Sequence, residues 1–142
     1  VNSFILAHEF AHALIHNFEL PVLGREEDAA DGIATVVLLK AEEGGLYAID
    51  AAEFWEAFSG RQDPPDLAEY ADNHSFDRQR ADNILCWVAG SDEPVLEAFL
   101  EHEILPEDRL AACPGEWELL RRSAEQVLDP HLVNGANLAP AE

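Results

Sequence analysis

Two histidines near the start of the chain enclose a glutamate in the stretch HEFAH, His8 to His12. On a helix, residues four apart share one face, so both imidazoles project in the same direction. This is the spacing that two ligands of one zinc ion need. Glu9 lies about 100° further round the helix, where its carboxylate reaches a water at the metal without ligating the metal. The stretch therefore predicts two zinc ligands, His8 and His12, and a general base, Glu9.

A catalytic zinc site needs a third protein ligand and an open position. His16 continues the four-residue spacing, but it lies about 12 Å from His8 along the helix axis, at a rise of 1.5 Å per residue. Zinc–nitrogen bonds are only about 2 Å long, so one ion does not hold all three histidines. The third ligand is therefore expected from another element.

The acidic segment that follows Pro21 and Gly24 offers that ligand. These two residues end the first helix and turn the chain, so that a second helix packs antiparallel to the first. Glu27 and Asp31 are four apart and share a face, so we predict that Glu27 ligates zinc. Asp31 would then accept the free N–H of a ligand histidine. Glu26 is the alternative ligand, and the plainer interpretation is that these acids only complement the dipole of a helix start.

The hydrophobic spacing is helical almost throughout and predicts a mainly α domain built on a hairpin of two site-bearing helices. Helices are expected over 2–17, 25–41, 50–58, 75–88, 94–102 and 116–128, with another opening at Pro106 that Pro114 and Gly115 interrupt. Asn2 or Ser3 would cap the first helix, and Gly44 with Gly45 would stop the second. Residues 59–66 read as a loop, 67–71 as a helical turn, and 46–49 as the one candidate strand.

Composition and charge limit the classes of protein to consider. The 142 residues suit one domain, 1–142, with a loose tail over 129–142. A net charge of −21 repels phosphate backbones and anionic lipid, which argues against nucleic-acid or membrane-surface partners. No apolar run approaches the roughly 20 residues that span a bilayer. The chain has no methionine and begins seven residues before His8, so we expect that an upstream segment is missing.

Several motifs together resemble a known family. HEFAH followed by EDAAD, Glu27 to Asp31, is similar to the HExxH…ExxxD arrangement of gluzincin metallopeptidases. The wider pattern is LPVLGREEDAAD, then HSFDRQRADNILCWVAGSDEP, then LPEDRLAACPGEWE. It resembles a bacterial putative metallopeptidase family, a domain of unknown function, over about residues 5–128.

The resemblance implies a zincin-like fold and a zinc-dependent peptidase acting on peptide or protein substrates. Glu27 would be the third ligand and Asp31 would support the site. Members of the family are longer at the N-terminus and carry a secretory signal, which implies a secreted or periplasmic protein. Cysteine number alone leaves Cys86 and Cys113 as either a disulfide or two thiols, and the resemblance to a secreted family favours the disulfide.

The implied mechanism also needs a group that stabilises the oxyanion. The chemically suitable side chains are His74, Tyr70, Arg80 and Tyr47; His74 is preferred because it lies in the HSFDRQR block. Arg78 and Arg80 could instead pair with the crowded acids. Two alternatives to the peptidase remain: a zinc-stabilised binding module without turnover, and an inactive fragment that binds metal weakly without upstream strands.

Overall fold

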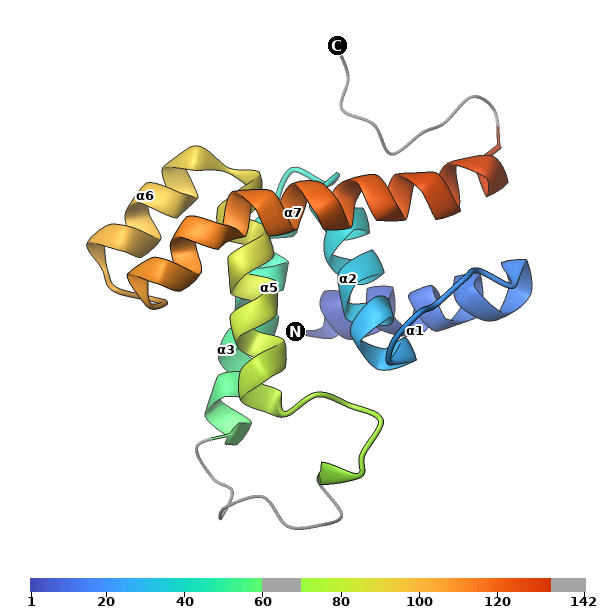
Figure 1. Ribbon diagram of the computed structural model, residues 1–142, viewed down its shortest axis with the longest axis horizontal. Coiled ribbons are helices and arrows are strands. Elements are labelled where there is room, and N and C mark those ends of the chain that lie inside the picture. Colours follow the sequence, from blue (N-terminus) through green and yellow to red (C-terminus); the bar gives the residue numbers. More distant parts are fainter. Residues whose placement is uncertain (60–69, 134–142) are drawn as a thin grey trace.

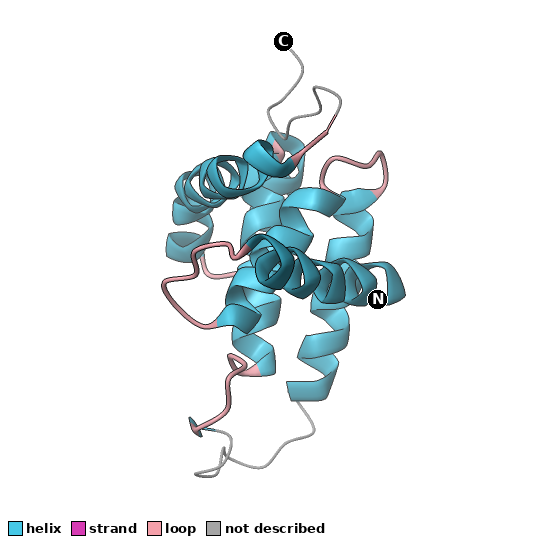
Figure 2. Ribbon diagram, turned by 90° about the vertical axis from the view of Figure 1, so that its right-hand side faces the viewer, coloured by secondary structure: helices cyan, strands magenta, loops and turns pink. Residues whose placement is uncertain are grey.

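A computed structural model describes residues 1–59 and 70–133, and within these ranges every regular element is a helix. The elements are α1 (Asn2–Phe18), α2 (Glu26–Leu38), α3 (Gly44–Ser59), α5 (Asp77–Ser91), α6 (Glu93–Glu101), α7 (Glu107–Leu128) and the short 3₁₀ helix η1 (Asp129–His131). The expected mainly α fold is therefore confirmed (Figure 2). None of the described helices combines the length and apolar character that a membrane span requires. The loop was expected to begin at Ser59, which is instead the last residue of α3. Residues 60–66 of that loop, most of the turn at 67–71 and the tail after 133 lie outside the described residues.

Helices α1 and α2 pack against each other, and so do α3 and α5, while α7 crosses over both pairs (Figure 1). One core cluster lies among α3, α5 and α7 and includes Ala48, Ile84 and Leu110. A second cluster lies among α1, α2 and α7 and includes Ile15 and Val36. The central helix, α2, contacts α1, α3, α5 and α7, and all of its residues from Ala30 to Val36 are buried.

The hairpin of α1 and α2 forms where the sequence predicts it. Helix α1 ends at Glu19, which adopts the left-handed conformation and donates its backbone N–H to the carbonyl of Ile15. Pro21 follows and prevents the helix from continuing. Helix α2 then begins with three acids, Glu26, Glu27 and Asp28, whose charges complement the positive end of the helix dipole.

The expected boundaries between residues 38 and 59 are wrong. Helix α2 ends at Leu38, before the two glycines, and Gly44 begins α3 instead of stopping α2. Residues 46–49 are therefore helical and not a strand, and the helix expected to begin at Asp50 begins at Gly44. A Cβ on Gly44 would lie 1.7 Å from the Leu38 carbonyl oxygen, so only glycine permits this tight turn. The predicted cap at Asn2 or Ser3 is also wrong, because the N-cap is Val1 without a side-chain bond.

Helix α7 continues through Pro114, where the sequence predicts an interruption. Proline removes one backbone hydrogen bond and costs about 3 kcal/mol in a helix interior, so packing must offset this cost. Cys113 is fully buried and bonded to Cys86 of α5. A Cβ on Gly90 of α5 would lie 2.2 Å from the Cys113 carbonyl oxygen, which shows how closely the two helices approach. These contacts hold the segment around the proline against α5.

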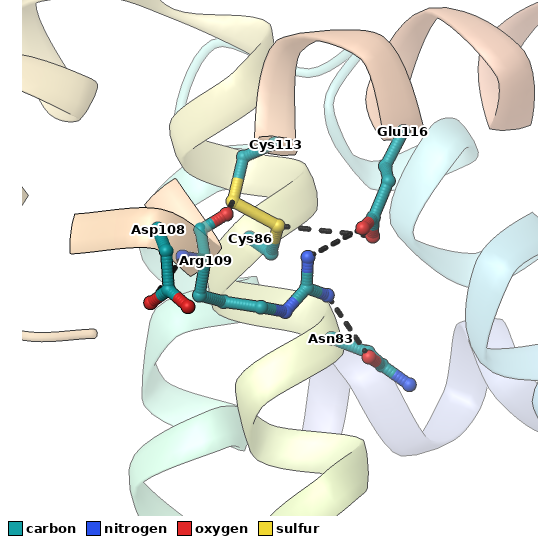
Figure 3. The surroundings of a disulfide bond; sticks show 6 residues. All are labelled: Asn83, Cys86, Asp108, Arg109, Cys113 and Glu116. Atoms are coloured by element: carbon teal, nitrogen blue, oxygen red, sulfur yellow. Dashed lines mark hydrogen bonds and ion pairs between the residues drawn. A yellow bond between two sulfur atoms is a disulfide. The ribbon is translucent and has the colours of Figure 1, made fainter. Parts of the chain in front are cut away.

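The disulfide between Cys86 and Cys113 confirms the pairing that the family resemblance favours. It joins α5 to α7, and Arg109 lies beside it with Glu116 and Asn83 as partners, at 2.6 and 3.2 Å (Figure 3). Both cysteines are fully buried.

Replacing Cys86 and Cys113 together by alanine is expected to lower the free energy of unfolding by about 3.5 kcal/mol, because the bond closes a 27-residue segment. The melting temperature should then fall by about 10 °C. Thermal melts with and without a reducing agent provide the control: the reductant should lower the wild-type melting temperature and leave that of the variant unchanged. A variant with the same melting temperature as the oxidised wild type would contradict a stabilising role for the disulfide.

Candidate metal centre

Helix α1 brings His8 and His12 to the face that packs on α2. The buried positions of α1 are Phe4, His8, Ala11 and Ile15, spaced by four, three and four residues. His8 is thus part of the buried stripe and is 7% exposed, while His12 lies at its edge. The apolar pattern that folds the hairpin therefore also turns both imidazoles toward α2.

Three donor atoms converge at this interface. His8 Nε2 lies 3.1 Å from His12 Nε2, and Glu27 Oε2 lies 3.2 Å from each of them. A tetrahedral ion with bonds of about 2.0 Å has ligand atoms about 3.3 Å apart. The three atoms are therefore spaced like three corners of a zinc coordination shell. Among the residues that the structure describes, His8, His12 and Glu27 are a group close enough together to hold one metal ion.

Each histidine has a carboxylate on its other ring nitrogen. His8 Nδ1 lies 2.8 Å from Asp31 Oδ1, and His12 Nδ1 lies 2.7 Å from Glu26 Oε1. A carboxylate only accepts, so the ring protons belong on Nδ1 and both Nε2 lone pairs point at the third carboxylate. Lone pairs directed at one another repel unless a cation lies between them. The donor set therefore fits a divalent metal, and it fits zinc in its mixture of nitrogen and oxygen ligands.

The carboxylates of Glu26, Glu27 and Asp31 surround the rings of His8 and His12 and favour a positive charge between them. Burial lowers the pKa of His12, but hydrogen bonds and charges from Glu26 and Glu27 outweigh it and raise that pKa above its ordinary value. Burial likewise raises the pKa of Asp31, but hydrogen bonds from His8 and Arg80 outweigh this and hold it below its usual range. Asp31 therefore stays ionised although it is only 2% exposed.

The comparison with known families agrees with this geometry. The model of a family described as "Putative metallopeptidase" matches residues 1–128 of the chain. The chain belongs to this metallopeptidase family. The family membership expected from the sequence is thereby confirmed. No curated protein and no solved structure matches the chain.

Glu9 and His74 lie on one small cleft beside the three converging donor atoms. The cleft has a volume of about 160 Å³, and its lining includes His8, Glu9, His74 and Ile5. The Glu9 side chain is exposed, as a group that meets substrate must be. His74 comes from the segment before α5, and its Nε2 lies 3.0 Å from Glu27 Oε2.

Both ring nitrogens of His74 face carboxylates, since Nδ1 lies 3.0 Å from Asp72 Oδ1. The His74 ring is therefore held between two carboxylates beside the three converging donor atoms. The backbone carbonyl of His74 accepts a hydrogen bond of 2.8 Å from Arg25 Nη1, at the start of α2. No pattern in the sequence indicates this contact, which links residues 49 positions apart.

The other candidate side chains are engaged in different contacts. Tyr47 donates to Glu43, the residue just before its helix α3, and Tyr70 makes an edge contact with the Phe76 ring. Arg80 also lines the cleft, but it is buried and its Nε and Nη2 already donate to Asp31, so these two nitrogens are not available to an oxyanion. His16 is 72% exposed and contacts Glu26, outside the three-donor group.

Glu26, the alternative ligand, lies behind His12 instead of among the three donors. Sequence spacing alone did not separate Glu26 from Glu27, because adjacent residues differ only in the direction of their side chains. The pairing of each histidine with its own carboxylate needs the crossing of α1 and α2, which the sequence does not specify.

Proposed function

We propose that this chain is a zinc-dependent peptidase that holds one ion through His8, His12 and Glu27. The observation that carries this proposal is the convergence of two imidazole nitrogens and one carboxylate oxygen, all within 4.8 Å of one another. Membership of the metallopeptidase family supports it. When bound, zinc supplies Lewis acidity, which activates a water and polarises the scissile carbonyl.

In this proposal Glu9 acts as the general base. Its carboxylate takes a proton from the attacking water and passes that proton to the leaving amine. Glu9 is suited to this because it is exposed on the cleft that His8 also lines, while its position on α1 keeps it outside the donor group. A purely structural metal site has no need of a base at such a position.

His74 would stabilise the negative charge that develops on the carbonyl oxygen. It lines the same cleft as Glu9, and its Nε2 reaches the Glu27 ligand oxygen. The contact with Arg25 holds its backbone in place. A fixed donor beside the metal costs little reorganisation at the moment of reaction, which is why such donors contribute strongly to catalysis.

We further propose that the protein acts in an oxidising compartment, as a secreted or periplasmic enzyme. The buried disulfide supports this, because disulfides are rare where thiols are kept reduced. The substrates would be peptides or proteins that enter the cleft from solvent.

The experiment pairs zinc analysis with a broad peptide-library digest of the purified protein. The proposal predicts about one zinc per chain and cleavage that a chelator stops and added zinc restores. Absence of zinc after equilibration with the metal would refute any zinc-dependent function. Tight zinc binding without cleavage of any library member would instead favour the binding-module alternative.

A further inference from the structure

Asp31 holds His8, and Arg80 in turn holds Asp31. Arg80 Nε donates to Asp31 Oδ2 at 2.8 Å, and Arg80 Nη2 donates to Oδ1 at 2.9 Å. The same Oδ1 accepts from His8 Nδ1 at 2.8 Å. We propose that Arg80 is a positioning residue of the metal centre, which orients His8 through the Asp31 carboxylate. This inference rests on the proposed zinc site.

The geometry of the contact explains how one side chain can orient another across 49 residues. A guanidinium that meets both carboxylate oxygens fixes the plane of the carboxylate as well as its position. Asp31 then cannot rotate about its last bond, so Oδ1 stays directed at His8. The His8 ring therefore keeps its Nδ1 proton on Asp31 and its Nε2 lone pair toward His12 and Glu27.

Arg80 is itself held in place by a third helix. Its Cζ atom lies 4.1 Å from the ring centroid of Trp55, so the guanidinium stacks on the aromatic face. The side chain is only 7% exposed, which leaves it little freedom to move. Contacts thus run from Trp55 of α3, through Arg80 of α5 and Asp31 of α2, to His8 of α1.

A purely structural ion pair would not need this arrangement. Buried pairs contribute little net stability compared with apolar residues of the same size, so stability alone is a weak reason for one here. Partners that hold a ligand histidine, in contrast, typically change metal affinity 10- to 100-fold. Arg78, two residues earlier, also pairs with acids, Glu56 and Asp82, but its side chain is half exposed and those acids are not bonded to His8. Arg78 is therefore a matched control.

The test is the zinc dissociation constant of the full chain, measured by competition with a chromophoric chelator. Arg80→Lys keeps the charge but removes the two-pronged contact, and we expect it to weaken zinc binding about 10-fold. Arg78→Lys should change the constant less than about twofold. The visible spectrum of the cobalt-substituted protein provides a second readout, which should change in Arg80→Lys and stay the same in Arg78→Lys. Circular dichroism shows whether each variant is folded.

A second comparison keeps the proposal testable if Arg80→Lys does not fold. In a variant that already carries Asp31→Asn, Arg80 keeps a buried positive charge that Asp31 no longer neutralises. Adding Arg80→Met removes this charge and should not lower the zinc affinity below that of the Asp31→Asn single variant. A further loss of about 10-fold there would mean that Arg80 does not act through Asp31, and would overturn the inference. So would a folded Arg80→Lys variant that binds zinc like the wild type, although the proposed function would then stand. A wild type that binds no zinc would refute both proposals.

Discussion

Glu9→Gln is expected to lower the rate of peptide hydrolysis by about 100- to 10,000-fold, the usual contribution of a general base, while the zinc content stays at wild-type level. Glutamine has nearly the same shape as glutamate but accepts no proton. Glu9 is outside the three-donor group and exposed, so the fold and the metal should be unaffected. The measurement is the turnover of a peptide identified by the library digest, with zinc determined on the same sample.

The matched control for Glu9 is Glu53→Gln, at an exposed glutamate on α3. It removes the same charge from the same highly acidic chain and should leave turnover unchanged. If both variants lose activity equally, the loss in Glu9→Gln comes from removing a negative charge from the chain and not from removing a general base. If Glu9→Gln retains full activity, another group removes the proton and the assignment of the base is wrong.

Glu27→Gln is expected to weaken zinc binding by at least about 100-fold, which exceeds the usual effect of partners that only hold a ligand. The substitution keeps the shape of the side chain but removes the negative charge nearest to both Nε2 atoms, at 3.2 Å from each. Chelator competition measures the dissociation constant, and hydrolysis should be lost at zinc concentrations that saturate the wild type.

Glu26→Gln is the control for Glu27, because the two glutamates are adjacent and only one joins the donor group. Glu26 contacts His12 Nδ1, so its amide variant should weaken zinc binding by no more than about 10- to 100-fold. The order of the two effects therefore decides between the two candidate ligands. A larger loss in Glu26→Gln than in Glu27→Gln would reverse the assignment.

The sequence predicted the first hairpin well because several local signals agree there. The apolar spacing of α1, the turn at Pro21 and the acidic start of α2 each favour the same two helices. The histidine spacing and the position of Glu27 follow from that hairpin, so the three donors could be chosen before their distances were known. The small set of candidate acids made the choice between Glu26 and Glu27 the main ambiguity.

The remainder depends on contacts between distant segments. Gly44 and Pro114 are normally helix breakers, but here one begins a helix and the other lies within one, because neighbouring helices pack around them. From the sequence, Arg80 could be an oxyanion donor or a partner of the crowded acids, and the structure pairs it with Asp31. Its contacts with Asp31 and Trp55 require that α3, α5 and α2 meet, and no local pattern specifies that meeting.

X-ray diffraction from crystals of the zinc-loaded protein, recorded at the zinc absorption edge, tests the central claim most directly. The account predicts one anomalous peak about 2 Å from His8 Nε2, His12 Nε2 and Glu27 Oε2 together. A peak bound by other side chains, or no peak at this place in crystals equilibrated with zinc, would contradict it.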